Sequence, residues 1–145
     1  MTALYNTQPQ DMEKKYGFPK AEHLTSKTLI DKLYKEGVSV VSFPLRAVYM
    51  TLEPEDTQPT AAILINVAKK RFRHAVDRNL LKRRIREAYR TNKPLFIEEL
   101  RAMNKSIAVA ILYIDNKHSS TEYLKRKMIK LLGAITEKEK QKCAD

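Results

Sequence analysis

Hydrophobic and polar positions follow two different periods along this chain, and the period predicts the type of each element. Apolar residues recur at three-to-four-residue spacing in three segments, as they do on the buried side of a helix. These predicted helices lie at 25–35, at 78–90 and from 119 to 136. Pro94 is expected to end or kink the second helix, and 95–103 to continue as a further helical piece.

Three other segments, 42–52, 60–68 and 106–114, are rich in strand-forming residues. The latter two are almost continuously apolar, which is typical of strands that are buried in a sheet. The segment 53–59 holds prolines and acidic residues and is predicted to be a turn. We expect it to join 42–52 and 60–68 as a long-looped antiparallel pair, with 60–68 in the centre of the sheet.

The order helix–strand–strand–helix–strand–helix predicts an α/β (α+β) two-layer sandwich, a small mixed sheet with the helices packed on one face. The other face of the sheet, or a groove between the first helix and the sheet, would stay open to a ligand. We expect three regions along the chain. They are a flexible N-terminal arm at 1–19, a single domain at 20–136 and a charged C-terminal tail at 137–145 that frays.

Composition and charge narrow the class of partner. A chain of 145 residues with a net charge of +11 and a pI near 9.8 is expected to form one domain that binds nucleic acid or an anionic membrane surface. No apolar run approaches the roughly 18 residues that a membrane span needs, and the N-terminus lacks the pattern of a signal peptide. The one cysteine, Cys143, cannot form an internal disulfide, which fits a reducing cytoplasm.

Most of the excess charge lies in the stretch 69–90, where ten Lys and Arg residues face two acidic residues, a local balance of +8. Within it, Arg78, Lys82, Arg86 and Arg90 form an i,i+4 row of like charges, and each such pair costs an isolated helix about 0.2–0.5 kcal/mol. A solvated charged face remains one interpretation of this row. A row that repels itself is better explained by a polyanion, such as a phosphate backbone that guanidinium groups grip bidentately.

No catalytic constellation can be assembled from the sequence. Three glycines form no phosphate-binding loop, and three scattered histidines provide neither a zinc site nor a nucleophile pair. We therefore expect no catalytic residue and no metal ligand in this chain. Three classes of function are open for such a basic chain. They are a non-catalytic RNA-binding protein of ribosomal type, a DNA-binding protein with its helix in the major groove, and a stand-alone nuclease, which would need clustered carboxylates.

The basic stretch closely resembles the signature of the bacterial ribonuclease P protein subunit. The matching residues are Lys69, Lys70, Ala75, Val76, Arg78, Asn79, Lys82, Arg83, Arg86, Glu87, Ala88, Tyr89 and Arg90. Weaker agreement extends the resemblance over roughly residues 20–135. The sequence departs from the family at Leu80, where an Arg is usual, at 71–74, where a Gly is usual, and at Ile30, where the first helix often has an aromatic residue.

The resemblance implies a fold in which the basic helix joins two parallel strands by a left-handed crossover. It also implies that the chain binds a large catalytic RNA and the 5′ leader of precursor tRNA, and that Mg²⁺ ions held mainly on the RNA perform the hydrolysis that removes the leader. The protein would be monomeric alone, with one copy per RNA.

The resemblance assigns residues to both RNAs. Contacts to the catalytic RNA are expected from Lys69, Lys70, Arg78, Asn79, Lys82, Arg83, Arg86 and Arg90. A cleft for the leader is expected from Ile30, Tyr34, Tyr49 and Asn66. For the two tyrosines, an ordinary place in the hydrophobic core remains the alternative.

Overall fold

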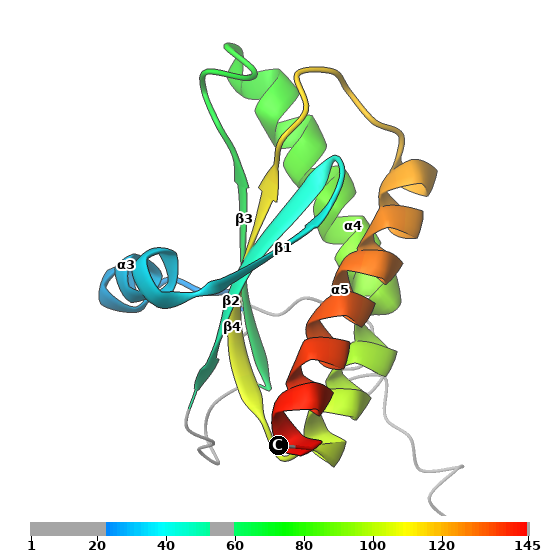
Figure 1. The fold of residues 1–145 in the computed structure, drawn as a ribbon. Coiled ribbons are helices and arrows are strands. Elements are labelled where there is room, and N and C mark those ends of the chain that lie inside the picture. Colours follow the sequence, from blue (N-terminus) through cyan, green and yellow to red (C-terminus); the bar gives the residue numbers. More distant parts are fainter. Residues whose placement is uncertain (1–22, 53–59, 145) are drawn as a thin grey trace, which may run out of the picture.

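The computed structural model describes residues 23–52 and 60–144 (Figure 1). Seven elements follow one another, and their labels are those of Figure 1. They are α3 (Lys27–Glu36), β1 (Val38–Ser42), β2 (Leu45–Leu52), β3 (Ala61–Val67), α4 (Ala75–Ala102), β4 (Ser106–Tyr113) and α5 (Thr121–Ala144). The predicted arm at 1–19 and the predicted turn at 53–59 lie outside the described residues.

The four strands form one mixed sheet in the order β1-β2-β4-β3. β4 pairs antiparallel with β2 and parallel with β3, so it lies between them. The expected antiparallel pairing of 42–52 with 60–68 is therefore wrong, and β4 takes the central place expected for β3. The reason is the crossover, because α4 carries the chain from the end of β3 back to the start of β4 and allows β4 to insert between β2 and β3. The left-handed sense of this crossover stays a prediction.

A short hairpin was not predicted. β1 pairs with β2 from Val38↔Tyr49 to Ser42↔Leu45, so a strand precedes the segment that was expected to be the first one. Only Phe43 and Pro44 separate the two strands. The predicted strand 42–52 therefore joined the last residue of β1, the turn and the whole of β2 into one strand.

Helices cover both faces of the sheet, whereas the prediction from the sequence was that all of them pack on one face. Figure 1 shows α4 and α5 side by side on one face and α3 crossing the other. The larger core cluster fills the space under α4 and α5, and a smaller cluster lies under α3. The predicted mixed α/β sandwich is confirmed. Because α3 covers only part of its face, an accessible strip of sheet remains beside it. This strip includes Arg46 of β2 and Asn66 of β3, which are both exposed and both lie beside Leu112 of β4.

Two helices are longer than predicted. α4 continues through Pro94 to Ala102, so this proline does not end the helix. α5 continues to Ala144, and the segment that was expected to fray is helical. Glu139, in the middle of that segment, is completely buried. The packed part of α5 therefore extends beyond residue 136, where the domain was predicted to end.

Candidate nucleic-acid interface

The outer side of α4 carries the predicted cationic surface. Leu81, Ile85, Ala88 and Tyr89 bury the inner side of this helix against the larger core cluster. At about 100° per residue, the opposite side presents the remaining positions of the same turns. Asn79, Arg83 and Arg86 are exposed there, and Lys82 is half-buried at its margin. Within the described residues, Lys82, Arg83 and Arg86 form no ion pair, so their charges are not neutralised by the protein.

Other predicted contacts have structural partners. Arg78 donates from Nη1 to the carbonyl oxygens of Phe72 (2.9 Å) and Arg73 (3.0 Å), which fixes the turn that leads into α4. Arg90 donates to the Glu87 carboxylate, with Nη2 2.6 Å from Oε1. The hydrogen bond from Arg90 also lowers the pKa of Glu87. These two arginines therefore make structural contacts, and their contact with RNA stays a prediction.

The two lysines that follow β3 lie in the turn that leads into α4. Lys69 and Lys70 are both exposed, in the turn between β3 and α4. Arg71 in the same turn donates from Nη1 to Asn116 Oδ1 at 3.2 Å, and Phe72 is buried against Tyr113 with ring centroids 5.8 Å apart. The departure from the family at 71–74 thus forms an anchored turn that leaves both lysines accessible.

Three of the four predicted leader-binding residues lie on the α3 side of the sheet. Ile30 is half-buried against the smaller core cluster, and Tyr34 follows it one helical turn later with 45% of its surface exposed. Asn66 is exposed on β3, opposite Leu112 of β4. Partial burial raises the pKa of Tyr34, so its phenol stays neutral at neutral pH and can both stack and donate a hydrogen bond.

Tyr49 was wrongly assigned to this cleft. Its side chain is completely buried in the larger core cluster, under α4 and α5 and on the face opposite to α3. The Lys142 ammonium lies 5.8 Å from its ring centroid. Side chains alternate between the two faces of a strand, and Leu45 and Ala47 share the face of Tyr49. The alternative interpretation, an ordinary core aromatic, is therefore correct for Tyr49.

The same alternation identifies Arg46 as a site candidate that was not predicted from the sequence. Arg46 is exposed on the face of β2 opposite to Tyr49, and its Nε donates to Ser39 Oγ at 2.9 Å. It adds a cation to the accessible strip of sheet. The signal was available in the sequence, because a charged residue between Leu45 and Ala47 marks the solvent-facing side of the strand.

The described residues offer neither a metal site nor a membrane-spanning helix. Among the described residues, no group of three or more His, Cys, Asp or Glu side chains is placed to hold a metal ion. None of the helices described is long and apolar enough to cross a membrane. A groove of about 500 Å³ lies between the second half of α4 and α5, and its lining includes none of the predicted site residues.

A small mixed sheet that carries an outward-facing, un-neutralised cationic helix defines an α/β protein of the nucleic-acid-binding class. Comparison with known families then identifies it more closely. The family model for ribonuclease P matches residues 18–136, and the chain belongs to the ribonuclease P protein family.

Individual relatives agree with this assignment. The ribonuclease P protein component of Porphyromonas gingivalis is 37% identical over 120 residues, which cover 83% of this chain and 87% of that protein. The component of Chlorobium phaeobacteroides is 35% identical over 125 residues, covering 80% and 86% respectively. The solved structure of the Staphylococcus aureus RNase P protein has a TM-score of 0.62 at 20% identity, over 80% of this chain and 96% of that one, which shows a shared fold.

Proposed function

We infer that this chain is the protein component of ribonuclease P, the endoribonuclease that removes the 5′ leader of precursor tRNA. Family membership supports this function over the alternative of a ribosomal-type RNA-binding protein. Its partners are accordingly the ribonuclease P RNA and the tRNA substrate. Within the structure, the outward face of α4 supports this function best. Arg83 and Arg86 are exposed on that face, and no acidic side chain among the described residues pairs with them.

We propose that this face binds the backbone of the catalytic RNA. Guanidinium groups bind phosphate bidentately, and each phosphate that is neutralised releases counterions from the RNA. The proposal assigns Lys82, Arg83, Arg86 and Asn79 to this contact. Lys69 and Lys70, in the turn that precedes α4, extend it toward the end of β3. Arg78 and Arg90 contribute charge while their structural partners hold them in place.

The accessible strip of sheet beside α3 is proposed to bind the single-stranded leader. Tyr34 supplies a half-exposed ring for stacking on a base, Asn66 supplies an amide, and Arg46 supplies a cation for the leader backbone. The two RNA surfaces would then lie on opposite faces of the sheet, with catalytic RNA on the α4 face. Hydrolysis is proposed to depend on Mg²⁺ held mainly by the RNA, in the cytoplasm, with one protein copy per RNA.

Reconstitution with the catalytic RNA at low Mg²⁺ tests the leader surface. Precursor tRNA should bind more tightly than mature tRNA, since stacking is worth about 1–3 kcal/mol per base. Tyr34→Ala should reduce this preference roughly fivefold or more, while binding of the protein to catalytic RNA stays unchanged.

Tyr49→Phe is the matched control, because this tyrosine is buried on the other face of the sheet. It should leave the leader preference intact. Equal binding of both tRNA forms by the unmodified holoenzyme would refute a leader surface on this protein, and an unchanged preference in Tyr34→Ala would remove Tyr34 from it.

A further inference from the structure

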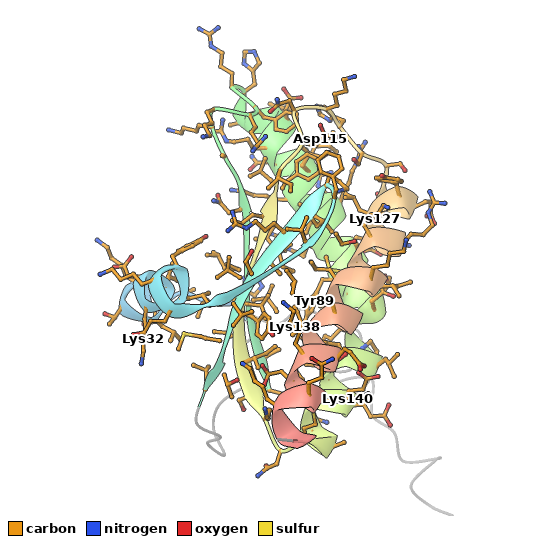
Figure 2. The ribbon with its side chains drawn as sticks, in the orientation of Figure 1. Lys32, Tyr89, Asp115, Lys127, Lys138 and Lys140 are labelled. Atoms are coloured by element: carbon orange, nitrogen blue, oxygen red, sulfur yellow. The ribbon has the colours of Figure 1, made fainter. Side chains whose placement is uncertain are left out.

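The first half of α5 carries a second group of cations, apart from the surface assigned on α4. Arg126, Lys127 and Lys130, which we call the α5 cationic patch, lie within one and a half turns of helix; Figure 2 labels Lys127. Arg126 and Lys130 are exposed, and Lys127 is half-buried. None of the three forms an ion pair with another described residue. Their i,i+3 and i,i+4 spacings place like charges side by side, which destabilises a helix.

Two of these cations contact an aromatic ring and not a carboxylate. Arg126 Cζ lies 5.6 Å and Lys127 Nζ 5.3 Å from the centroid of the Tyr123 ring. A cation–π contact attracts a cation to the ring face, but unlike an ion pair it brings no opposite formal charge. Tyr123 therefore positions two cations and leaves their positive charge available to a partner.

Other cations of the same helix have carboxylate partners. Lys125 Nζ lies 3.8 Å from Glu122 Oε1, Lys140 Nζ lies 4.0 Å from Glu99 Oε2, and Lys142 Nζ lies 3.3 Å from Glu139 Oε1. The three cations of the patch differ from these because they are adjacent to one another and none is paired with a described carboxylate. This contrast indicates that the patch is a surface for an external anion, because an ordinary solvated helix face mixes both signs.

The patch extends to the side of α5 that faces away from α4. Ile129 lines the groove between the two helices, and at about 100° per residue Lys127 points about 160° away from it. α5 also packs on β1 and β2, whereas α4 packs on β3. The α4 surface and the α5 cationic patch therefore occupy opposite margins of one helical layer, as Figure 1 lets the reader follow.

We propose that the α5 cationic patch binds the phosphate backbone of a second segment of the catalytic RNA, so that the protein joins two parts of that RNA across its helical layer. This inference rests on the proposed function. Phosphate could also come from precursor tRNA, but the proposed leader surface lies on the opposite face of the sheet. The catalytic RNA is favoured because the patch shares its layer with α4.

Salt-dependent binding of the full chain to catalytic RNA alone tests the proposal. In the triple variant Arg126→Gln/Lys127→Gln/Lys130→Gln, glutamine keeps a strong helix propensity and removes each charge. The slope of log affinity against log salt should become shallower by roughly two units, since one lost phosphate contact is worth about 0.7–0.9. At 0.15 M salt this corresponds to a loss of affinity of about 50-fold.

Two comparisons isolate the cause. Lys140→Gln removes a charge that Glu99 already pairs with, so it should change the slope less than Lys127→Gln does. The charge-preserving triple variant Arg126→Lys/Lys127→Arg/Lys130→Arg should keep the native slope. Circular dichroism of each variant checks that the helix content is unchanged.

The outcomes separate this inference from the proposed function. An unchanged slope in the triple glutamine variant, with Arg83→Gln/Arg86→Gln strongly weakened, would overturn the inference and leave the α4 contact standing. A loss that is seen only when precursor tRNA is present would also overturn it, because the patch would then face the substrate. If the α4 double variant bound normally as well, the proposed contact to catalytic RNA would itself fail.

Discussion

The most specific stability prediction concerns Glu139, a completely buried carboxylate in the second half of α5. It accepts hydrogen bonds from Lys105 Nζ at 2.7 Å, Lys142 Nζ at 3.3 Å and Thr51 Oγ1 at 3.2 Å. Thr51 belongs to β2, and Lys105 immediately precedes β4. One carboxylate therefore ties the last turns of α5 to two neighbouring strands, and we expect the order of this segment to depend on it.

Glu139→Gln keeps the size of the side chain and removes its charge. Breaking a fully buried ion pair from one side costs about 3–5 kcal/mol, because the other charge stays buried without compensation. Here the Lys105 side chain is 18% exposed and that of Lys142 is 53% exposed, so both ammonium groups can gain water. We therefore expect the free energy of unfolding to fall by roughly 2 kcal/mol, and Tm by about 6 °C.

The pH dependence gives a second, independent readout. Burial raises the pKa of Glu139, but the hydrogen bonds from Lys105 and Lys142 outweigh this effect, and the net pKa lies below its ordinary value. The carboxylate therefore stabilises the folded protein above its unfolded-state pKa of about 4.3. This stabilisation is lost as the pH falls from there through the lower folded-state pKa.

Urea and thermal unfolding, followed by circular dichroism between pH 7 and pH 3, measure both effects. The native protein should lose stability more steeply below about pH 4.3 than Glu139→Gln does, so the two should converge in acid. Glu137→Gln is the matched control, since Glu137 is exposed two residues earlier on the same helix. If Glu139→Gln and Glu137→Gln unfolded alike, or if the difference between the native protein and Glu139→Gln did not shrink as the pH fell below about 4.3, the reasoning about the buried cluster would be wrong.

Tyr49→Phe should leave the free energy of unfolding unchanged or raise it by up to about 1 kcal/mol. The reason is that the buried Tyr49 hydroxyl has no hydrogen-bond partner among the described residues. A clear loss of stability in urea unfolding would contradict this prediction. Gly37→Ala should destabilise the fold, because a Cβ at Gly37 would overlap the backbone oxygen of Leu33. Gly133→Ala should stabilise it by about 0.5–1 kcal/mol, because a Cβ there meets nothing within 4 Å. The same sign for both variants in thermal unfolding would refute the packing argument. Arg86→Gln should make the slope of log affinity against log salt for catalytic-RNA binding shallower by about 0.7–0.9. At 0.15 M salt the affinity should fall about fourfold. A salt titration of this variant that gives the native slope would show that Arg86 does not touch phosphate.

The parts of the fold that depend on local spacing could be predicted from the sequence. The three-to-four-residue spacing of Leu81, Ile85 and Ala88 identified the buried side of α4, and the exposed cations followed from it. The apolar run of β4 likewise identified a buried strand, in which nearly every side chain is buried. These two interpretations were correct because the neighbours that decide them lie within one helical turn or one strand, although similar local reasoning missed the β1–β2 hairpin and the continuation of α4 through Pro94.

The parts that depend on distant partners could not be predicted in this way. The burial of Glu139 depends on Lys105, 34 residues away, and on Thr51, 88 residues away. Without them, a run of Glu and Lys at the end of the chain has the composition of a fraying tail. The insertion of β4 between β2 and β3 is a similar case, since sequence order alone favours pairing of consecutive strands.

Several cations that join α5 to its neighbours have a nearby carboxylate, unlike the cations that we propose to bind RNA. Lys140 has Glu99, and Lys105 has Glu139. The α4 surface and the α5 cationic patch have none among the described residues. Repulsion within each surface opposes helix formation in the free protein, and RNA phosphate relieves it. Added salt and bound RNA should therefore both raise the Tm of the protein. Thermal unfolding in rising salt without RNA, and with RNA at one salt concentration, measures how much of that repulsion each removes.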